Sequence, residues 1–389
     1  MVFLYAGMPG REAGGRVQSD EFYMKRALEL ARRAEGETSP NPMVGCVITD
    51  ADGNIVGEGW HHKAGQPHAE IMAMEDMKQR HGKGYTAYVS LEPCSHYGRT
   101  GPCCDALIRA GFHRVVAAMV DPNPKVSGRG LQRLRDAGVD VTVGVCEAEA
   151  RRLNEKFLLW VTEGRPFVSL KFAETLDGKL ATYTGDSCYV TGEEAHRYSH
   201  YLRKTHDAIL VGSGTVLSDD PALTTRLVPG RNPVRVVLDG RARIPLTARL
   251  LQEEGQTLVA VGPEAAPDKV ASLRQLPGVE VLSLPTAGPD GGLDLQALLA
   301  ALQERELTSV LVEGGSAVLG SFLDAGLADR VYAFVAPKLI GGAGALSAVG
   351  GKGIATMAAC AVVEETECLP LGRDWLLTGR VRFAAPAAR

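Results

Sequence analysis

The chain has little of what marks secreted, membrane or disulfide-rich proteins. It holds 8 cysteines in 389 residues, too few for the disulfide framework of a small secreted domain. No stretch approaches a membrane span, and the opening run Val2-Phe3-Leu4-Tyr5 is much shorter than a signal-peptide core. We therefore expect a cytoplasmic protein in a reducing compartment, with no membrane partner.

An excess of positive charge is also missing. The formal net charge is -4, and no repeat or low-complexity run interrupts the chain. A protein that binds nucleic acid without regard to sequence needs a clustered basic face, so a nucleic-acid partner is not expected. The apolar fraction of 45% and charged fraction of 23% are typical of a globular protein. A small-molecule substrate fits this composition better.

Residues 68–103 hold a group of side chains that suits zinc. His68 and Glu70 stand at the head of a helical pattern, and Cys94 and Cys103 follow after a predicted strand at residues 86–91. A catalytic zinc takes three protein ligands and leaves one position open, which His68, Cys94 and Cys103 would satisfy. Glu70 would remain free to move protons. A closed structural site is the alternative, with Cys104 or His96 as a fourth ligand.

The set is similar to the zinc deaminases of bases and nucleotides, whose signature is H-x-E followed by P-C-x-x-C. In that chemistry a water activated by zinc attacks a ring carbon that bears an amino group, and a glutamate that does not bind the metal carries protons. Here the second cysteine comes nine residues after the first instead of three. This expanded loop, at residues 93–103, and the Pro40-Asn41-Pro42-Met43-Val44-Gly45 segment resemble the bifunctional deaminase/reductase family of riboflavin biosynthesis.

That resemblance implies roles for several residues of the first half. It makes Glu70 the catalytic acid and base, and it places the third ligand at Cys103 instead of Cys104. A helix begins near Cys103, and a helix amino terminus favours a thiolate. The resemblance also places Asn41 at the pyrimidine pocket, although asparagine in such a segment is ordinarily a turn former.

Alternating strands and helices divide the chain into two α/β domains. We expect a disordered extension at residues 1–18, a first domain at 19–164 that closes with a helix over residues 147–162, and a second domain at 165–389 after Gly164-Arg165-Pro166. The closing β-like stretches predict a mixed sheet in the second domain. The resemblance implies a cytidine-deaminase-like three-layer αβα fold for the first domain and a dihydrofolate-reductase-like α/β fold for the second.

Two glycine-containing stretches follow strands in the second half. They are Gly212-Ser213-Gly214-Thr215 and Glu313-Gly314-Gly315-Ser316, and neither is the G-x-G-x-x-G of a dinucleotide fold. Glycines there let backbone amides approach a phosphate, but such glycines are often only structural. Together with Leu176-Asp177-Gly178, these stretches resemble the reductase half of the same family, which uses NADPH.

The resemblance assigns ligand contacts position by position. The nicotinamide-cofactor contacts that it implies are Ala173, Tyr189, Thr215, Asp219, Gly240, Gly315, Ser316, Ala317, Val318, Leu319, Gly320 and Ser321. The substrate contacts that it implies are Asn41, Ser187, Arg203, Leu223, Arg226 and Glu313. Two arginines suit a ribose phosphate because guanidinium can bind it bidentately. Without the resemblance, a solvated surface position is the simpler interpretation of each.

We therefore predict successive deamination and reduction of a phosphoribosylamino-pyrimidinone, with Zn²⁺ and NADPH as cofactors. The resemblance also suggests a homo-oligomer, either a dimer or a tetramer. One alternative is a nucleoside or base deaminase with a carboxyl-terminal binding domain that reduces nothing. Another is a non-catalytic zinc protein with four ligands.

Overall fold

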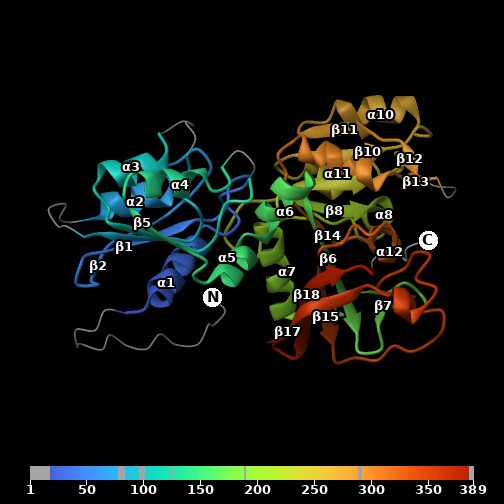
Figure 1. Ribbon diagram of the computed structural model, residues 1–389. Helices are drawn as coiled ribbons and strands as arrows, with labels where there is room; N and C mark the ends of the chain where they lie inside the picture. Colours follow the sequence, from blue (N-terminus) through green and yellow to red (C-terminus); the bar gives the residue numbers. More distant parts are fainter. Residues whose placement is uncertain are drawn as a thin grey trace. The chain divides into compact units, whose positions relative to one another are not determined.

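The computed structural model describes residues 18–77, 84–95, 101–123, 126–187, 190–287 and 291–384. It separates into two compact units, residues 1–154 and 155–389, and each is described by itself (Figure 1). The disordered extension expected at residues 1–18 lies outside the described residues, except for residue 18. Within the described ranges, no helix combines the length and the apolar character that crossing a membrane requires.

The first unit is built on a five-stranded mixed sheet in the order β2-β1-β3-β4-β5. Strand β1 is antiparallel to both β2 and β3, whereas β3, β4 and β5 are parallel. Helices α2, α3 and α4 cover one face, and α1 and α5 lie on the other (Figure 1). The strands are β1 (Gly45–Thr49), β2 (Ile55–Trp60), β3 (Thr86–Val89), β4 (Arg114–Ala117) and β5 (Asp140–Val143), and the helices are α1 (Asp20–Arg32), α2 (Ala69–Asp76), α3 (Cys103–Arg109), α4 (Arg129–Asp136) and α5 (Glu147–Leu153).

A glycine in β2 sets the position of α2, the helix that follows His68. A Cβ atom at Gly59 would lie 2.3 Å from the backbone nitrogen of Ala73, so only glycine lets the helix backbone approach the strand this closely. The buried side chains Ala69 and Ala73 fill the same interface. This contact fixes the first turn of α2 against the sheet.

The helix expected over residues 147–162 is interrupted at Asn154. Helix α5 ends at Leu153 and α6 (Glu155–Glu163) begins at once. The Asn154 side chain accepts a hydrogen bond from the Met43 amide at 2.8 Å and donates one to the Met43 carbonyl at 2.9 Å. Glu155 instead pairs with Arg330 at 2.8 Å. The division between the units therefore falls earlier than the expected Gly164 junction, because α6 packs with the second unit.

The second unit contains a nine-stranded mixed sheet in the order β11-β10-β9-β8-β14-β6-β15-β18-β17. The strands from β11 to β15 in that order are parallel, and β18 and β17 add an antiparallel hairpin at one edge. The strands are β6 (Phe167–Thr175), β8 (Ala208–Gly212), β9 (Val234–Leu238), β10 (Thr257–Val261), β11 (Val279–Ser283), β14 (Ser309–Val312), β15 (Arg330–Ala336), β17 (Val362–Leu371) and β18 (Asp374–Arg382).

Apolar clusters fill both faces of this sheet. One is formed with α11 and α12, and the other with α9 and α10. The short helices α8, α9 and α10 were not predicted, because so few residues give no clear helical period. The remaining helices are α7 (Glu193–Thr205), α8 (Ser213–Asp219), α9 (Arg249–Gln252), α10 (Pro267–Arg274), α11 (Leu295–Gln303) and α12 (Ser316–Asp324), and the minor strands are β7 (Lys179–Ala181), β12 (Thr286–Ala287), β13 (Gly292–Leu293) and β16 (Leu346–Ser347).

Parallel pairing aligns the carboxyl ends of β14, β8 and β9 along one edge of the sheet. These strands are neighbours in the order β9-β8-β14, and they end at Leu238, Gly212 and Val312. The segments with expected cofactor contacts follow directly after them. Loops at the carboxyl ends of parallel strands are where α/β proteins bind ligands.

Candidate functional sites

A compact group of ligand atoms lies at the amino ends of α2 and α3. The Nδ1 atom of His68 is 3.5 Å from the Sγ of Cys94 and 3.3 Å from the Sγ of Cys103. All three candidate ligand atoms lie within 4.8 Å of one another. Two sulfurs and one imidazole nitrogen suit Zn²⁺, and three ligands leave a position open. The donor set therefore fits a catalytic zinc.

Cys104 points away from this group. Its side chain is fully buried in the core under α3, and its thiol donates to the Asp105 carboxylate at 3.7 Å. Successive residues at a helix start face different directions, so only Cys103 meets His68 and Cys94. The other candidate for a fourth ligand, His96, lies outside the described residues.

The helix start at Cys103 acts on Cys94 instead of on its own thiol. The Cys103 backbone amide donates to the Cys94 Sγ at 3.3 Å. Hydrogen bonds from Cys103 and His68 lower the pKa of Cys94 to about 4. The pKa of Cys103 is raised, because its proton is shared with Cys94 and because it is buried. The expected effect of the helix start on the Cys103 thiol itself stays a prediction.

Glu70 lies in the first turn of α2 and is 3% exposed. Burial, followed by the negative charge of Cys94, raises the pKa of Glu70 to about 7. A carboxyl group with a pKa near neutrality can both accept and release a proton at neutral pH. Glu70 therefore has the properties of a general acid and base.

Asn41 is held by a histidine that sequence reasoning missed. The Nδ1 atom of His61 is 3.1 Å from the Pro67 carbonyl oxygen, and its Nε2 is 3.1 Å from the Nδ2 of Asn41. A carbonyl can only accept, so Nδ1 carries the proton and Nε2 accepts from the Asn41 amide. The Asn41 side-chain oxygen is thereby left to accept from a ligand. His61 directly follows β2, and a polar residue at a strand end was the available signal.

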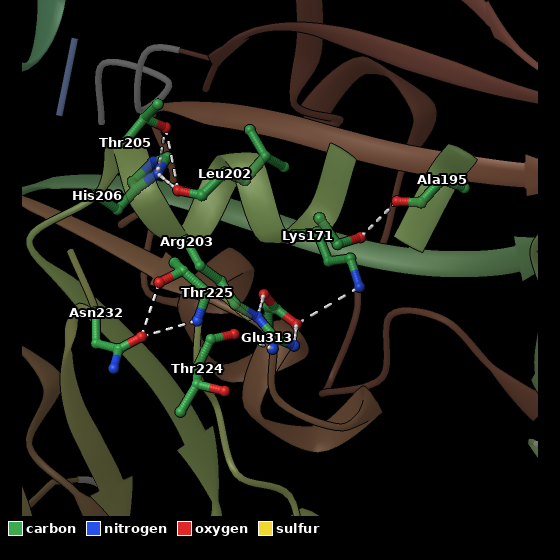
Figure 2. A network of polar contacts seen from close by, with 11 residues as sticks. Lys171, Ala195, Leu202, Arg203, Thr205, His206, Thr224, Thr225, Asn232 and Glu313 are labelled. Atoms are coloured by element: carbon green, nitrogen blue, oxygen red, sulfur yellow. Dashed lines mark hydrogen bonds and ion pairs between the residues drawn. The ribbon is translucent and has the colours of Figure 1, made fainter. Parts of the chain in front are cut away.

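In the second unit, Arg203 and Glu313 form a buried ion pair (Figure 2). The Arg203 Nε and Nη2 atoms each donate to a Glu313 carboxylate oxygen at 2.9 Å, and Lys171 Nζ lies 3.6 Å from the same carboxylate. Burial would raise the pKa of Glu313, but the charges of Arg203 and Lys171 hold it at about 2. Glu313 is therefore a carboxylate.

Arg203 is not the solvated surface residue that a lone arginine suggests. Its side chain is 13% exposed, and its Nη1 also donates to the Thr224 carbonyl at 3.1 Å. Guanidinium has five N–H groups, and these three bonds leave two for a ligand. Arg203 therefore orients Glu313 and retains two donors that a ligand could use.

The other expected substrate contacts of this unit differ in burial. Arg226 and Ser187 are exposed, whereas Leu223 is 3% exposed and has a φ of 55°. The left-handed backbone at Leu223 is uncommon for a residue with a side chain, and such conformations occur often at ligand sites. Among the expected cofactor contacts, Tyr189 lies outside the described residues.

The ends of β8 and β14 are joined where the cofactor is expected. The Gly315 amide donates to Thr215 Oγ1 at 3.1 Å. Gly240 follows β9 along the same edge, Ala173 lies in β6, and Asp219 is the exposed last residue of α8. Glycines at and after these adjacent strand ends leave backbone groups open to a nucleotide, so these residues fit NADPH.

Not every residue of α12 can face a cofactor with its side chain. Leu319 is fully buried in the core. A Cβ atom at Gly320 would lie 2.2 Å from the Gly350 carbonyl carbon, so that position faces another segment. Ser316 is mostly buried, Val318 is half-buried, and Ala317 and Ser321 are exposed. Within residues 316–321, only the first turn of α12 and Ser321 therefore present side chains that a cofactor could contact.

His200 is a second histidine that sequence reasoning missed. It lies one turn before Arg203 on α7 and is 4% exposed. Its Nδ1 atom has no hydrogen-bond partner within the part of the chain that the structure describes. Burial, then the charges of Arg203 and Arg226, lower the pKa of His200 to about 4. His200 is therefore a neutral imidazole beside a charged cluster.

Two family models match the chain, one for each half. Residues 17–119 match the cytidine and deoxycytidylate deaminase zinc-binding region, and residues 166–377 match the RibD C-terminal domain. The first unit has a cytidine-deaminase-like fold and the second a dihydrofolate-reductase-like fold, so both expectations of fold are confirmed. The chain is of the class of two-domain enzymes that join a zinc deaminase to a reductase.

Comparison with whole proteins identifies the family within that class. The riboflavin biosynthesis protein RibD of Aquifex aeolicus is 46% identical over 360 residues, which are 92% of this chain and 97% of that protein. RibD of Escherichia coli is 46% identical over 83% of this chain and 89% of that protein. The structure of Acinetobacter baumannii RibD aligns with a TM-score of 0.81 and 37% identity over 93% of this chain and 99% of its own. The chain belongs to the RibD family of riboflavin biosynthesis proteins.

Proposed function

We propose that this enzyme catalyses two successive steps of riboflavin biosynthesis. The first is hydrolytic deamination of 2,5-diamino-6-(5-phosphoribosylamino)pyrimidin-4(3H)-one. The second is NADPH-dependent reduction of the ribosyl side chain, which gives 5-amino-6-(5-phosphoribitylamino)uracil. A Thermotoga maritima protein aligns over 93% of this chain and 99% of its own, with a TM-score of 0.79 and 38% identity. It is described as a diaminohydroxyphosphoribosylaminopyrimidine deaminase and 5-amino-6-(5-phosphoribosylamino)uracil reductase.

The observation that carries the first activity is the convergence of His68, Cys94 and Cys103 beside buried Glu70. Zinc, when bound, supplies an activated water for hydrolysis of the amino group. Glu70 takes a proton from the attacking water and passes it to the leaving ammonia, because its pKa near 7 suits both transfers. The Asn41 side-chain oxygen, oriented by His61, accepts a hydrogen bond from the pyrimidine.

The second activity rests on the strand ends and the charged cluster of the second unit. NADPH, when bound, supplies the hydride that reduces the ribosyl C1′. Thr215 and Gly315 hold the nucleotide between β8 and β14. Glu313, kept ionised by Arg203 and Lys171, accepts hydrogen bonds from the substrate. Exposed Arg226 and the free donors of Arg203 bind the ribose phosphate.

A deaminase with a non-reducing carboxyl-terminal domain is not favoured. The match to the RibD C-terminal domain covers residues 166–377, and relatives of the whole chain carry both halves. A structural zinc site with four ligands is supported less well than a catalytic site. Cys104 faces the core, and the carboxyl group of Glu70 lies near the three candidate ligands.

A coupled assay tests the proposed function. Zinc-loaded protein is given the diaminopyrimidinone phosphate with and without NADPH, and products are separated and identified by mass. We expect the deaminated pyrimidine alone without NADPH, and the ribitylamino product with it. A product that remains unreduced in the presence of NADPH would support the non-reducing alternative.

We also propose a cytoplasmic homo-oligomer. A reducing compartment keeps the candidate ligand thiols available for zinc. The hairpin of β17 and β18 ends the second sheet and exposes Val362, Trp375 and Leu377, which are 57%, 41% and 46% accessible. An exposed apolar strand pair at a sheet edge suits pairing with a second copy. Light scattering on the purified chain measures the stoichiometry, and a monomer at micromolar concentration would contradict this proposal.

A further inference from the structure

The turn after β9 presents two arginines next to the strand-end edge. Asp239 is fully buried, and its Oδ2 accepts from the Ile244 amide at 2.8 Å. The Ala242 amide donates to the Asp239 carbonyl at 2.9 Å, and Ala242 has a φ of 54°. These contacts fix the backbone of the turn. Its two cations, Arg241 and Arg243, have side chains that are 71% and 58% exposed.

Arg243 reaches across from the end of β9 to the end of β8. Its Nη2 donates to the Ser213 hydroxyl at 2.8 Å, and its Nε lies 3.9 Å from Asp239 Oδ1. Ser213 is 5% exposed and directly follows β8. The guanidinium is therefore anchored at one nitrogen and near a carboxylate at another, and its remaining N–H groups are open to solvent. Arg241 instead pairs with Glu264 at the surface at 3.0 Å.

The place of Arg243 matters because of its neighbours on the strand edge. Thr215 lies two residues after Ser213, and Gly240 lies three residues before Arg243. Both are expected cofactor contacts. A strand-end carboxylate commonly binds the 2′-hydroxyl of the adenosine ribose in NAD enzymes, whereas an arginine accommodates the 2′-phosphate of NADP. Here the strand-end carboxylate, Asp239, is buried and bonded to its own turn, and the arginine is exposed.

We propose that Arg243, supported by Ser213, binds the 2′-phosphate of NADPH and makes the reductase prefer NADPH to NADH. The inference rests on the proposed reductase function. A guanidinium fork matches phosphate oxygens, and the hydroxyl of Ser213 holds it at the edge where the nucleotide lies. Arg241 contributes less, because Glu264 competes for it.

The test is a binding titration of the full chain with NADPH, NADH and adenosine 2′,5′-bisphosphate, followed by calorimetry. Arg243→Ala should weaken NADPH and the bisphosphate by about ten- to a hundredfold, because charge-assisted hydrogen bonds are lost. Its affinity for NADH should stay within about twofold, since NADH lacks the phosphate. Arg243→Lys should fall between, and Ser213→Ala should give a smaller loss of the same selectivity. Arg382→Ala is the matched control, because Arg382 is another exposed arginine of this unit with a carboxylate nearby.

The outcomes distinguish a failure of this inference from a failure of the proposed reductase function. If the wild-type chain binds NADPH and reduces the substrate, but Arg243→Ala weakens NADPH and NADH equally, Arg243 does not read the phosphate. An unchanged NADPH affinity in Arg243→Ala would overturn the inference as well. Failure of the wild-type chain to bind either nucleotide would instead refute the proposed reductase. Where Arg243→Ala lowers the thermal unfolding temperature, the ratio of the two affinities in Ser213→Ala decides.

Discussion

The two units position their candidate residues in different ways. In the first, three ligand atoms lie within 4.8 Å of one another, and each stands at or near a helix start or a strand end. In the second, the candidate residues come from several strands, helices and loops, and the central pair, Arg203 and Glu313, is held together by two mutual hydrogen bonds. The first site is compact, and the second is spread over several elements of the fold.

This difference follows from the chemistry that each unit performs. A metal accepts few ligand types at fixed distances, so its site needs particular residues close together. A nucleotide and a phosphorylated substrate are long, and backbone amides or interchangeable polar side chains can bind them. Substitutions in the first unit should therefore act in an all-or-none manner, whereas those in the second should act by degrees.

The largest effect is expected for Glu70→Gln. An amide cannot carry protons, so deamination should fall by about a hundred- to ten-thousandfold while zinc stays bound. The same variant should still reduce deaminated intermediate supplied from outside. Product formation and metal content are measured together, with Glu75→Gln, an exposed glutamate of the same helix, as the control. Substantial deamination by zinc-loaded Glu70→Gln would remove Glu70 from the mechanism.

The next effect separates two adjacent cysteines. Cys103→Ser should lose zinc to a chelator at concentrations that leave the wild-type protein loaded, because one of three ligands is gone. Cys104→Ser should retain zinc but unfold at a lower temperature, because a hydroxyl replaces a thiol in the core. Metal analysis after dialysis, with thermal unfolding, distinguishes them. Equal loss of zinc in both variants would mean that the assignment of Cys103 is wrong.

An intermediate effect is expected for Arg203→Lys in the second unit. Lysine keeps the charge but cannot bind Glu313 with a fork, so substrate affinity should fall by about ten- to a hundredfold and NADPH affinity by much less. Titration with each ligand measures this split, and Arg197→Lys, exposed on the same helix, is the control. Equal weakening of both ligands would make Arg203 part of the scaffold alone.

The smallest effect concerns pH. His200 has its ordinary value of 6.5 when unfolded and about 4 in the fold. The unfolded chain therefore binds a proton that the folded chain refuses, and stability is lost as pH falls from about 6.5 to about 4. His200→Gln should reduce this slope by up to about 1.4 kcal/mol per pH unit. The free energy of the unfolding transition that NADPH stabilises is measured across this pH range, with His113→Gln as the control. An unchanged slope would contradict the buried neutral state.

Much of the first site was predictable, because its residues carry the spacing that metal chemistry demands. His68, Cys94 and Cys103 were proposed as ligands from their order and their neighbours, and the structure brings them together. His61 was not predicted, because its partners are a carbonyl and the distant Asn41. The contact between the Cys103 amide and Cys94 was also not predicted, since it joins residues nine positions apart in the chain.

The second unit was predicted less completely, because more of its contacts join residues that are distant in the chain. Its strands and the mixed sheet were predicted from apolar runs. Helix α8 was not predicted, because it is short and lies in a glycine-containing stretch. The ion pair of Arg203 with Glu313 joins positions far apart in the chain, and nothing local in the sequence announces it. The early division at Asn154 likewise depends on side-chain bonds to Met43.

Selective removal of zinc tests whether the two reactions take place at separate sites, one in each unit. The full chain is treated with a chelator, and NADPH consumption is followed with either the diaminopyrimidinone phosphate or its deaminated product. We expect consumption to stop with the first compound and to continue at an unchanged rate with the second, because only the first unit requires the metal. Loss of both rates on zinc removal, or of neither, would contradict the assignment of the two reactions to the two units.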